Sequence, residues 1–158
     1  MKISGEIRVT AARDAVFAEL RNVQFFASCI EGVHDLVPVD EMHFDAVLET
    51  KVAYMSFRFR VAVTFTEISA PHAIAAKIEG SPLGIAGRLT ATTRTQLEES
   101  GNETRICYEI DVALTGKLGS IGQPVLKAKA KEMERQFAHN LRARFAESGD
   151  ASTQRSAA

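Results

Sequence analysis

The sequence lacks long apolar runs and has little cysteine. Its longest wholly apolar stretches are a few residues, far short of the ~20 that a membrane-spanning helix needs. Its start alternates polar and apolar residues without the apolar segment of a signal peptide, so we expect a cytoplasmic protein. The two cysteines, Cys29 and Cys107, lie in unrelated segments with no CxxC pair. This arrangement predicts free thiols in a reducing compartment.

The sequence also has few histidines and a small net charge, which argue against a metal site and against nucleic-acid binding. The four histidines (His34, His43, His72 and His139) are dispersed and show no helix-face spacing such as HExxH. We therefore expect no metal and no other cofactor. The formal net charge of −1 does not favour attraction of nucleic acid over the whole surface, and none is expected as a partner.

The chain length and composition fit one globular domain: 158 residues, of which 46% are hydrophobic and 25% charged. Residues 2–10 alternate with period two, which predicts a half-buried strand in which Gly5 marks a bend or bulge. Residues 12–30 show helical spacing, which predicts one or two short helices.

The period of two returns at residue 33 and continues for some eighty residues, broken by short turns. This pattern predicts six more strands in an antiparallel meander, most clearly over residues 57–66. After Gly116, apolar residues recur every three or four positions, which predicts a long helix from about residue 120 to 146. Residues 147–158 contain no apolar side chain larger than alanine, so we expect a disordered polar tail outside a domain of residues 1–146.

The order of elements predicts an α+β fold. A seven-stranded curved antiparallel sheet must cover its apolar face, and only the C-terminal helix is long enough to do so. We therefore expect the sheet to wrap around that helix, with two short helices after the first strand.

No constellation of catalytic residues is visible. The glycine-containing stretch GKLGSIG at 116–122 lacks the spacing of a phosphate-binding loop, and its glycines suit a turn from strand to helix. Inward hydroxyls such as Tyr108 have no histidine at a recognisable spacing, and no GxSxG motif is present. We assign no catalytic residue.

The apolar positions that face the predicted interior admit two interpretations. They are core, or they line a pocket for a lipophilic small molecule, because aromatic and methionine side chains with few polar groups build both. The candidate ligand-binding residues are Phe44, Leu48, Phe57, Phe59, Ile78, Leu89, Tyr108, Ile110, Met133 and Phe137.

The final helix is basic. Residues 117–145 hold seven Lys or Arg against two Glu, whereas residues 1–116 hold eleven basic and sixteen acidic residues. The basic residues form either a solvated outer face of the helix or a docking face for an acidic partner or an anionic membrane. The candidate docking residues are Lys127, Lys131 and Arg135.

Several short motifs occur in the order found in one family. They are Lys2–Glu6 (KISGE), Ala27–Gly32 (ASCIEG), Lys51-Val52, the 116–122 stretch, and Gln136-Phe137. Over about residues 1–145 the chain resembles the carbon monoxide dehydrogenase G-subunit family, within the START/polyketide-cyclase helix-grip superfamily. The family's usual proline after Ile30 is Glu31 here, and the membrane-contacting C-terminal extension of its longer members is replaced by a short polar tail.

The resemblance implies a helix-grip fold with a hydrophobic cavity, in an accessory protein of molybdenum hydroxylases of the carbon monoxide dehydrogenase type. We therefore expect a non-catalytic protein that binds a quinone or lipid, associates with hydroxylase subunits and aids their recruitment to the membrane. Contact of the chain itself with the inner face of the membrane would be at most peripheral. Two alternatives remain: a cyclase- or hydrolase-like enzyme, which would need an ionisable partner beside Tyr108 or an inward threonine, and a docking module with a filled core.

Overall fold

The computed structural model describes the backbone of residues 1–157 and the side chains of residues 1–146. The elements follow the order that the sequence predicts: β1 (Lys2–Val9), α1 (Arg13–Arg21), α2 (Val23–Ser28), β2 (Val33–Pro38), β3 (His43–Val52), β4 (Met55–Ser69), β5 (Ala73–Pro82), β6 (Gly87–Ser100), β7 (Glu103–Gly116), the 3-10 turn η1 (Lys117–Ser120) and α3 (Gln123–Ala157).

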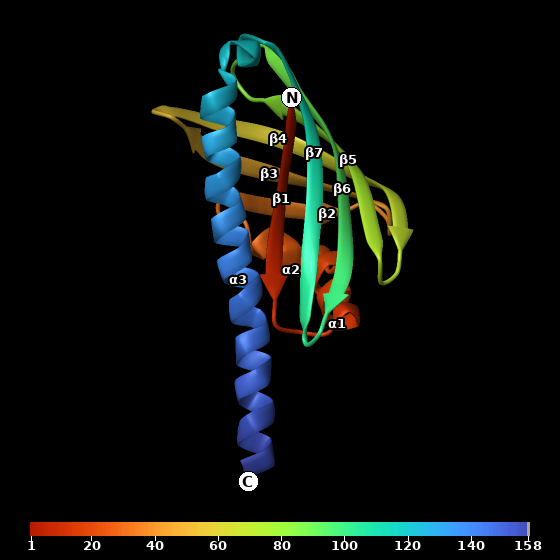
Figure 1. Cartoon of the computed structure of the whole chain (residues 1–158). Helices are drawn as coiled ribbons and strands as arrows, with labels where there is room; N and C mark the ends of the chain where they lie inside the picture. The colour runs from red at the N-terminus through yellow and green to blue at the C-terminus, as the bar shows by residue number, and fades with distance from the viewer. Residues whose placement is uncertain (158) are drawn as a thin grey trace.

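The seven strands form one antiparallel sheet in the order β1-β7-β6-β5-β4-β3-β2. The sheet is strongly curved, so that β2, β3 and β4 run across the direction of β1, β6 and β7 (Figure 1). Helix α3 crosses the concave side and contacts the edge strand β1 and, across the sheet, β3, which lies next to the other edge strand. The predicted fold class is confirmed.

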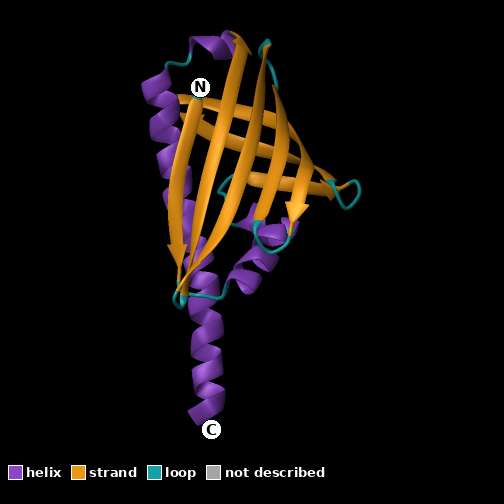
Figure 2. Cartoon of the chain, turned by 45° about the vertical axis from the view of Figure 1, so that its right-hand side comes forward, coloured by secondary structure: helices purple, strands orange, loops and turns teal. Residues whose placement is uncertain are grey.

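Helices α1 and α2 lie at the end of the sheet away from η1 (Figure 2). Val16, Phe17 and Leu20 of α1 are buried against the sheet and the middle of α3. The side chain of Asn22 accepts a hydrogen bond from the Phe25 amide at 3.1 Å, which caps the start of α2.

Two local expectations differ from the structure. Strand β1 pairs with β7 in uninterrupted register, so Gly5 marks no bulge. The expected helix end near residue 146 is also wrong, because the backbone of α3 stays helical to Ala157. The side chains beyond residue 146 lie outside the described residues, and a separate polar tail at 147–158 stays a prediction.

Candidate binding site between the sheet and helix α3

Two separate clusters of buried side chains occupy the two ends of the concave face. The first, here called the lower core, joins β1, β5, β6, β7 and α1 to the middle of α3, where Ala138 and Leu141 are buried. The second, the upper core, contains Val52, Phe57 and Phe59 with Leu118 of η1. The two clusters have no residue in common among the described part of the chain.

Two cross-strand rows of inward side chains lie between these cores. The register of the sheet aligns Phe44, Val63, Ile78, Ala91 and Val112 in one row, and Phe65, Ala76, Thr93, Ile110 and Ile3 in the next. We call them the middle rows. Only the two alanines are buried, and every larger side chain in the rows stays partly exposed.

The facing surface of α3 is also only partly covered. Met133 and Ala130 lie on the same helix face as Phe137 and Leu141, one to three turns nearer the N-terminus. Both are half-buried, and neither belongs to the lower or the upper core. Apolar surface left accessible to water costs about 25 cal/mol per Å². An apolar molecule between α3 and the middle rows would recover that energy.

One polar contact borders this region. Tyr108 of β7 donates a hydrogen bond to Glu134 Oε1 of α3, across the face of β1. A Cβ atom on Gly5 would lie 2.3 Å from the Tyr108 hydroxyl and 2.2 Å from Glu134 Oε1. Gly5 therefore provides the room in which the phenol and the carboxylate meet. Glu134 also accepts a hydrogen bond from Lys131 Nζ at 3.4 Å.

Burial raises the pKa of the Tyr108 phenol, and the hydrogen bond and negative charge of Glu134 raise it further. The phenol therefore stays protonated at neutral pH and acts as a hydrogen-bond donor. Glu134 is the ionisable partner that the enzyme alternative requires beside Tyr108. Their shared hydrogen bond also closes the seam between α3 and the edge strand β1.

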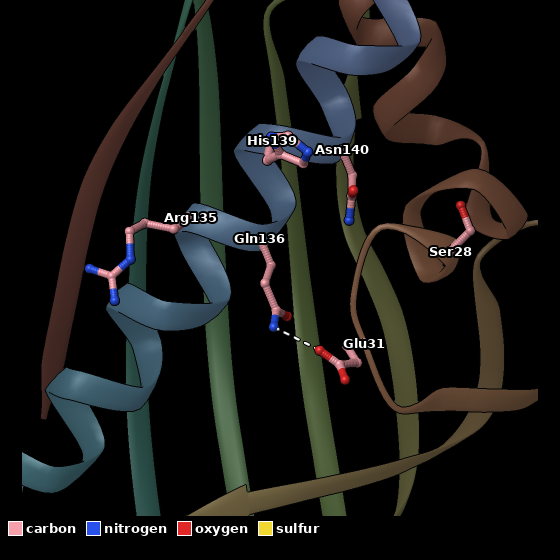
Figure 3. A pocket seen from close by; sticks show the side chains of 6 residues that line it. All are labelled: Ser28, Glu31, Arg135, Gln136, His139 and Asn140. Carbon is pink, nitrogen blue, oxygen red and sulfur yellow. Dashed lines mark hydrogen bonds between the residues drawn. The ribbon is translucent and has the colours of Figure 1, made fainter.

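An open groove of about 600 Å³ runs between α3 and the turn after α2. Figure 3 shows the six residues that line it: Ser28, Glu31, Arg135, Gln136, His139 and Asn140. Gln136 Nε2 donates to Glu31 Oε2 at 2.9 Å across the groove, and Asn140 Nδ2 donates to the Cys29 carbonyl at 2.9 Å. The groove is thus bridged by two polar contacts.

The ten candidate ligand-binding residues fall into three groups. Phe57, Phe59, Leu48 and Leu89 belong to or pack against the upper core, and Tyr108 and Phe137 pack against the lower core. The remaining four, Phe44, Ile78, Ile110 and Met133, lie in the half-buried region between the cores.

The three candidate docking residues are all exposed. Lys127, Lys131 and Arg135 recur every four positions and so lie along one side of α3. Arg135 also lines the groove.

Sequence reasoning missed Glu134, Glu31 and Gln136 as parts of the site. Glu134 lies among the charges of a basic helix, and nothing in its spacing indicates that it contacts Tyr108, which precedes it by 26 positions. Glu31 and Gln136 each lie in a motif of the family resemblance, yet their hydrogen bond joins residues 105 positions apart. The replacement of proline by Glu31 was the available signal.

Two further classes of site have no counterpart in the part of the chain that is described. No group of three or more His, Cys, Asp or Glu residues there is arranged to hold a metal ion. No helix there combines the length and the apolarity needed to cross a bilayer.

Solved structures place this architecture in a class. The chain is similar to a conserved protein from Geobacillus kaustophilus, with TM-score 0.85 and 21% identity over 94% of this chain and 97% of the other. A START superfamily protein from Mycobacterium smegmatis aligns with TM-score 0.67 and 13% identity, covering 90% and 95%. The Zhui aromatase/cyclase from Streptomyces sp. R1128 aligns with TM-score 0.66 and 11% identity, covering 91% and 92%. The chain therefore shares its fold with these proteins, a START superfamily protein and an aromatase/cyclase among them.

The family follows from the sequence match. Residues 5–146 match the CoxG family, the G subunits of carbon monoxide dehydrogenase. The chain belongs to this family, as the short motifs indicated. No curated protein matches the chain.

Proposed function

We propose that this protein is a non-catalytic accessory protein that holds a lipophilic small molecule, a quinone or a lipid, between α3 and the middle rows. It serves a molybdenum hydroxylase of the carbon monoxide dehydrogenase type and aids its recruitment to the membrane. It acts in the cytoplasm, with at most peripheral contact with the membrane's inner face. The observation that carries the proposal is the half-buried apolar surface between two separate cores.

The middle rows match the chemistry of such a ligand. Their side chains are aliphatic or aromatic except for Thr93, and the Tyr108 hydroxyl and Glu134 carboxylate lie one cross-strand row further toward the lower core. A ring or chain would contact the apolar rows, and an oxygen substituent would reach the polar pair. Binding sites for lipophilic small molecules usually combine a large apolar surface with a few polar groups.

The groove beside α3 is the proposed route of entry. It opens between α3 and the turn after α2, and the Glu31–Gln136 hydrogen bond crosses it. In this proposal the hydrogen bond slows exchange of the ligand without contributing to its affinity. Gln136→Ala should therefore accelerate release of a bound probe while leaving the equilibrium dissociation constant within about twofold.

A pair of alanine variants tests the binding site. Ala91 lies in a middle row, whereas Ala113 lies on the exposed opposite face of the sheet. Ala91→Leu would fill space that the ligand occupies, so we expect it to reduce binding of the apolar fluorophore N-phenyl-1-naphthylamine at least tenfold with little loss of stability. Ala113→Leu should leave binding unchanged.

Native mass spectrometry of gently purified protein, followed by organic extraction, provides the second measurement. We expect a bound lipophile that a short-chain quinone competes away. If the interior is packed solid, Ala91→Leu would instead destabilise the fold by about 1–3 kcal/mol through overpacking. That result, together with the absence of any retained or competed lipophile, would refute the carrier function and favour the docking module with a filled core.

The exposed basic side of α3 is the proposed docking face for the hydroxylase. Its three candidates, Lys127, Lys131 and Arg135, project from one side of the helix, where positive charge would steer an acidic partner. Charge reversal at all three should abolish capture of purified hydroxylase subunits at low salt. Unchanged capture would reject this face as the docking surface.

A further inference from the structure

Five large apolar side chains are exposed on three connections that border the N-terminal end of α3. Tyr54 and Met55 lie at the β3–β4 turn, Leu83 and Ile85 in the β5–β6 loop, and Val125 in the first turn of α3. The Tyr54 side chain is the most exposed of them, at 94%. We call these five residues the apolar tip.

Backbone contacts fix the β5–β6 loop to its neighbours on both sides. The Leu83 amide donates to the Arg58 carbonyl at 2.8 Å, which fixes the β5–β6 loop beside β4. The Lys117 amide donates to the Ala86 carbonyl at 3.1 Å, which fixes the same loop beside η1. All three connections adjoin the upper core, in which Val52 and Leu118 are buried. Figure 1 shows them near the N-terminal end of α3.

The charge nearest the apolar tip is mainly positive. Residues 50–60, 80–90 and 112–127, which lead into and out of the tip, contain six Lys or Arg and no Asp or Glu. Two of the six form ion pairs with acids just outside these segments, Arg58 with Glu49 and Arg88 with Glu79.

Three exposed lysines lie near the tip: Lys51 and Lys127 are within three positions of a tip residue, and the Lys117 amide bonds to Ala86, the residue after Ile85. None of the three forms an ion pair with a described residue.

The opposite end of the long hairpin lacks both features. The β6–β7 turn carries Glu98, Glu99 and Glu103 within six residues, and the tip's mixture of aromatic and aliphatic side chains is absent from that turn. Arg105 pairs with Glu98 and Arg13 with Glu99, so that turn presents no excess of positive charge. Only the end with the apolar tip complements a surface with an apolar interior and negative headgroups.

We infer that the apolar tip is a docking surface for an anionic lipid bilayer. The five side chains enter the boundary between headgroups and acyl chains, and Lys51, Lys117 and Lys127 contact the phosphates. The β6–β7 turn faces away from the membrane. This orientation places the N-terminal end of α3 at the bilayer, and it does not depend on the identity of any ligand held in the interior.

Co-sedimentation of the full chain with lipid vesicles tests this inference. We expect binding to vesicles of phosphatidylglycerol and phosphatidylcholine, weaker binding to phosphatidylcholine alone, and a decrease as salt is raised. Each Lys→Gln change at Lys51, Lys117 or Lys127 should weaken binding about fivefold, since each basic residue near such a surface contributes about 1 kcal/mol.

Two matched double serine variants distinguish insertion of the tip from non-specific hydrophobic binding to vesicles. Tyr54→Ser with Leu83→Ser removes apolar surface from the tip and should reduce vesicle binding at least tenfold. Val37→Ser with Val39→Ser removes side chains that are also exposed, at 55% and 60%, but lie outside the tip. This control pair should bind within twofold of the unaltered protein. Because all four side chains are exposed, both pairs should keep the thermal midpoint of the parent.

Three results would overturn the inference: no binding to either vesicle, equal losses in the two serine pairs, or binding that ignores the lysine changes. Loss of hydroxylase capture in the tip variants without any vesicle binding would identify the tip as a protein interface instead. Vesicle binding by a protein that retains no lipophile would leave this inference standing and refute only the carrier function.

Discussion

Gly5→Ala is the most direct test of how α3 is held against the sheet. The added Cβ would lie 2.2 Å from Glu134 Oε1, 2.3 Å from the Tyr108 hydroxyl and 2.5 Å from Tyr108 Cζ. These separations are far below van der Waals contact, so both side chains must move. Their hydrogen bond, which joins β7 to α3, cannot survive in its present form.

The expected cost follows from three contributions. Overpacking in a fitted interior costs about 1–3 kcal/mol. Loss of a hydrogen bond to a charged group costs about 1.5–3 kcal/mol. Replacing glycine by alanine returns about 0.4–1 kcal/mol by restricting the unfolded chain. We therefore expect a net destabilisation of about 3 kcal/mol, which lowers the thermal midpoint by about 6–12 °C in a chain of this size.

Gly80→Ala is the matched control. Gly80 is also an inward-facing strand glycine, but a Cβ there would have its nearest neighbour, Leu89 Cβ, at an ordinary 3.5 Å. We expect this variant to be neutral or slightly stabilised. Urea denaturation of both variants gives the free energies of unfolding.

A double-mutant cycle identifies the partner. The cost of Gly5→Ala should fall by about 1 kcal/mol or more in a Tyr108→Phe background, since one of the three clashing atoms and the hydrogen bond to Glu134 are already absent there. If Gly5→Ala is tolerated as well as Gly80→Ala, the assignment of Gly5 as the space for this contact is wrong.

Three further measurements address single groups. In a Tyr54→Phe variant Tyr108 is the only tyrosine, and its raised pKa predicts no tyrosinate absorbance near pH 10 until the protein unfolds. Because the phenol ionises at lower pH in the unfolded chain than in the folded one, the free energy of unfolding should fall as pH rises above about 10. Ordinary tyrosine titration in the folded protein would contradict this expectation. Cys29 is buried and its pKa is raised. In a Cys107→Ser variant the Cys29 thiol should therefore react with Ellman's reagent only as fast as the protein opens. A fast reaction at pH 8 would show that the Cys29 thiol is accessible in the folded protein. Leu141→Ala should destabilise the protein by about 3–5 kcal/mol in urea titrations, because its side chain is fully buried in the lower core, and a loss below 1 kcal/mol would mean that α3 is not anchored there.

The period of the apolar residues was sufficient to predict the fold. Alternation over residues 57–66 and helical spacing after Gly116 each identify an element and its buried face. These signals are local, and short turns leave few ways to connect the strands. The end of α3 was misplaced because the stretch after residue 146 has no apolar periodicity, and the backbone is helical there without it.

The site was only partly accessible to the same reasoning. The alternation of residues along a strand shows only which face of the sheet a side chain occupies, so it assigns Phe44 and Phe59 alike. In the structure Phe59 is buried in the upper core, whereas Phe44 is half-buried between the cores. How fully a face is covered depends on the curvature of the sheet. The Glu134 contact and the role of Gly5 depend on where α3 crosses β1, which no local pattern specifies.

The separation of the two cores gives the first turns and the middle turns of α3 unequal anchorage. Phe137, Ala138, Leu141 and Phe145 fasten the later turns to the lower core, whereas no residue of Gln123–Glu134 contributes to either cluster. The earlier turns have half-buried side chains, the Tyr108–Glu134 hydrogen bond and the covalent connection to η1. Local opening of a segment requires less free energy where fewer apolar contacts must break. Amide hydrogens in the first three turns should therefore exchange with solvent before those of the turns around Leu141, by partial detachment of one continuous helix.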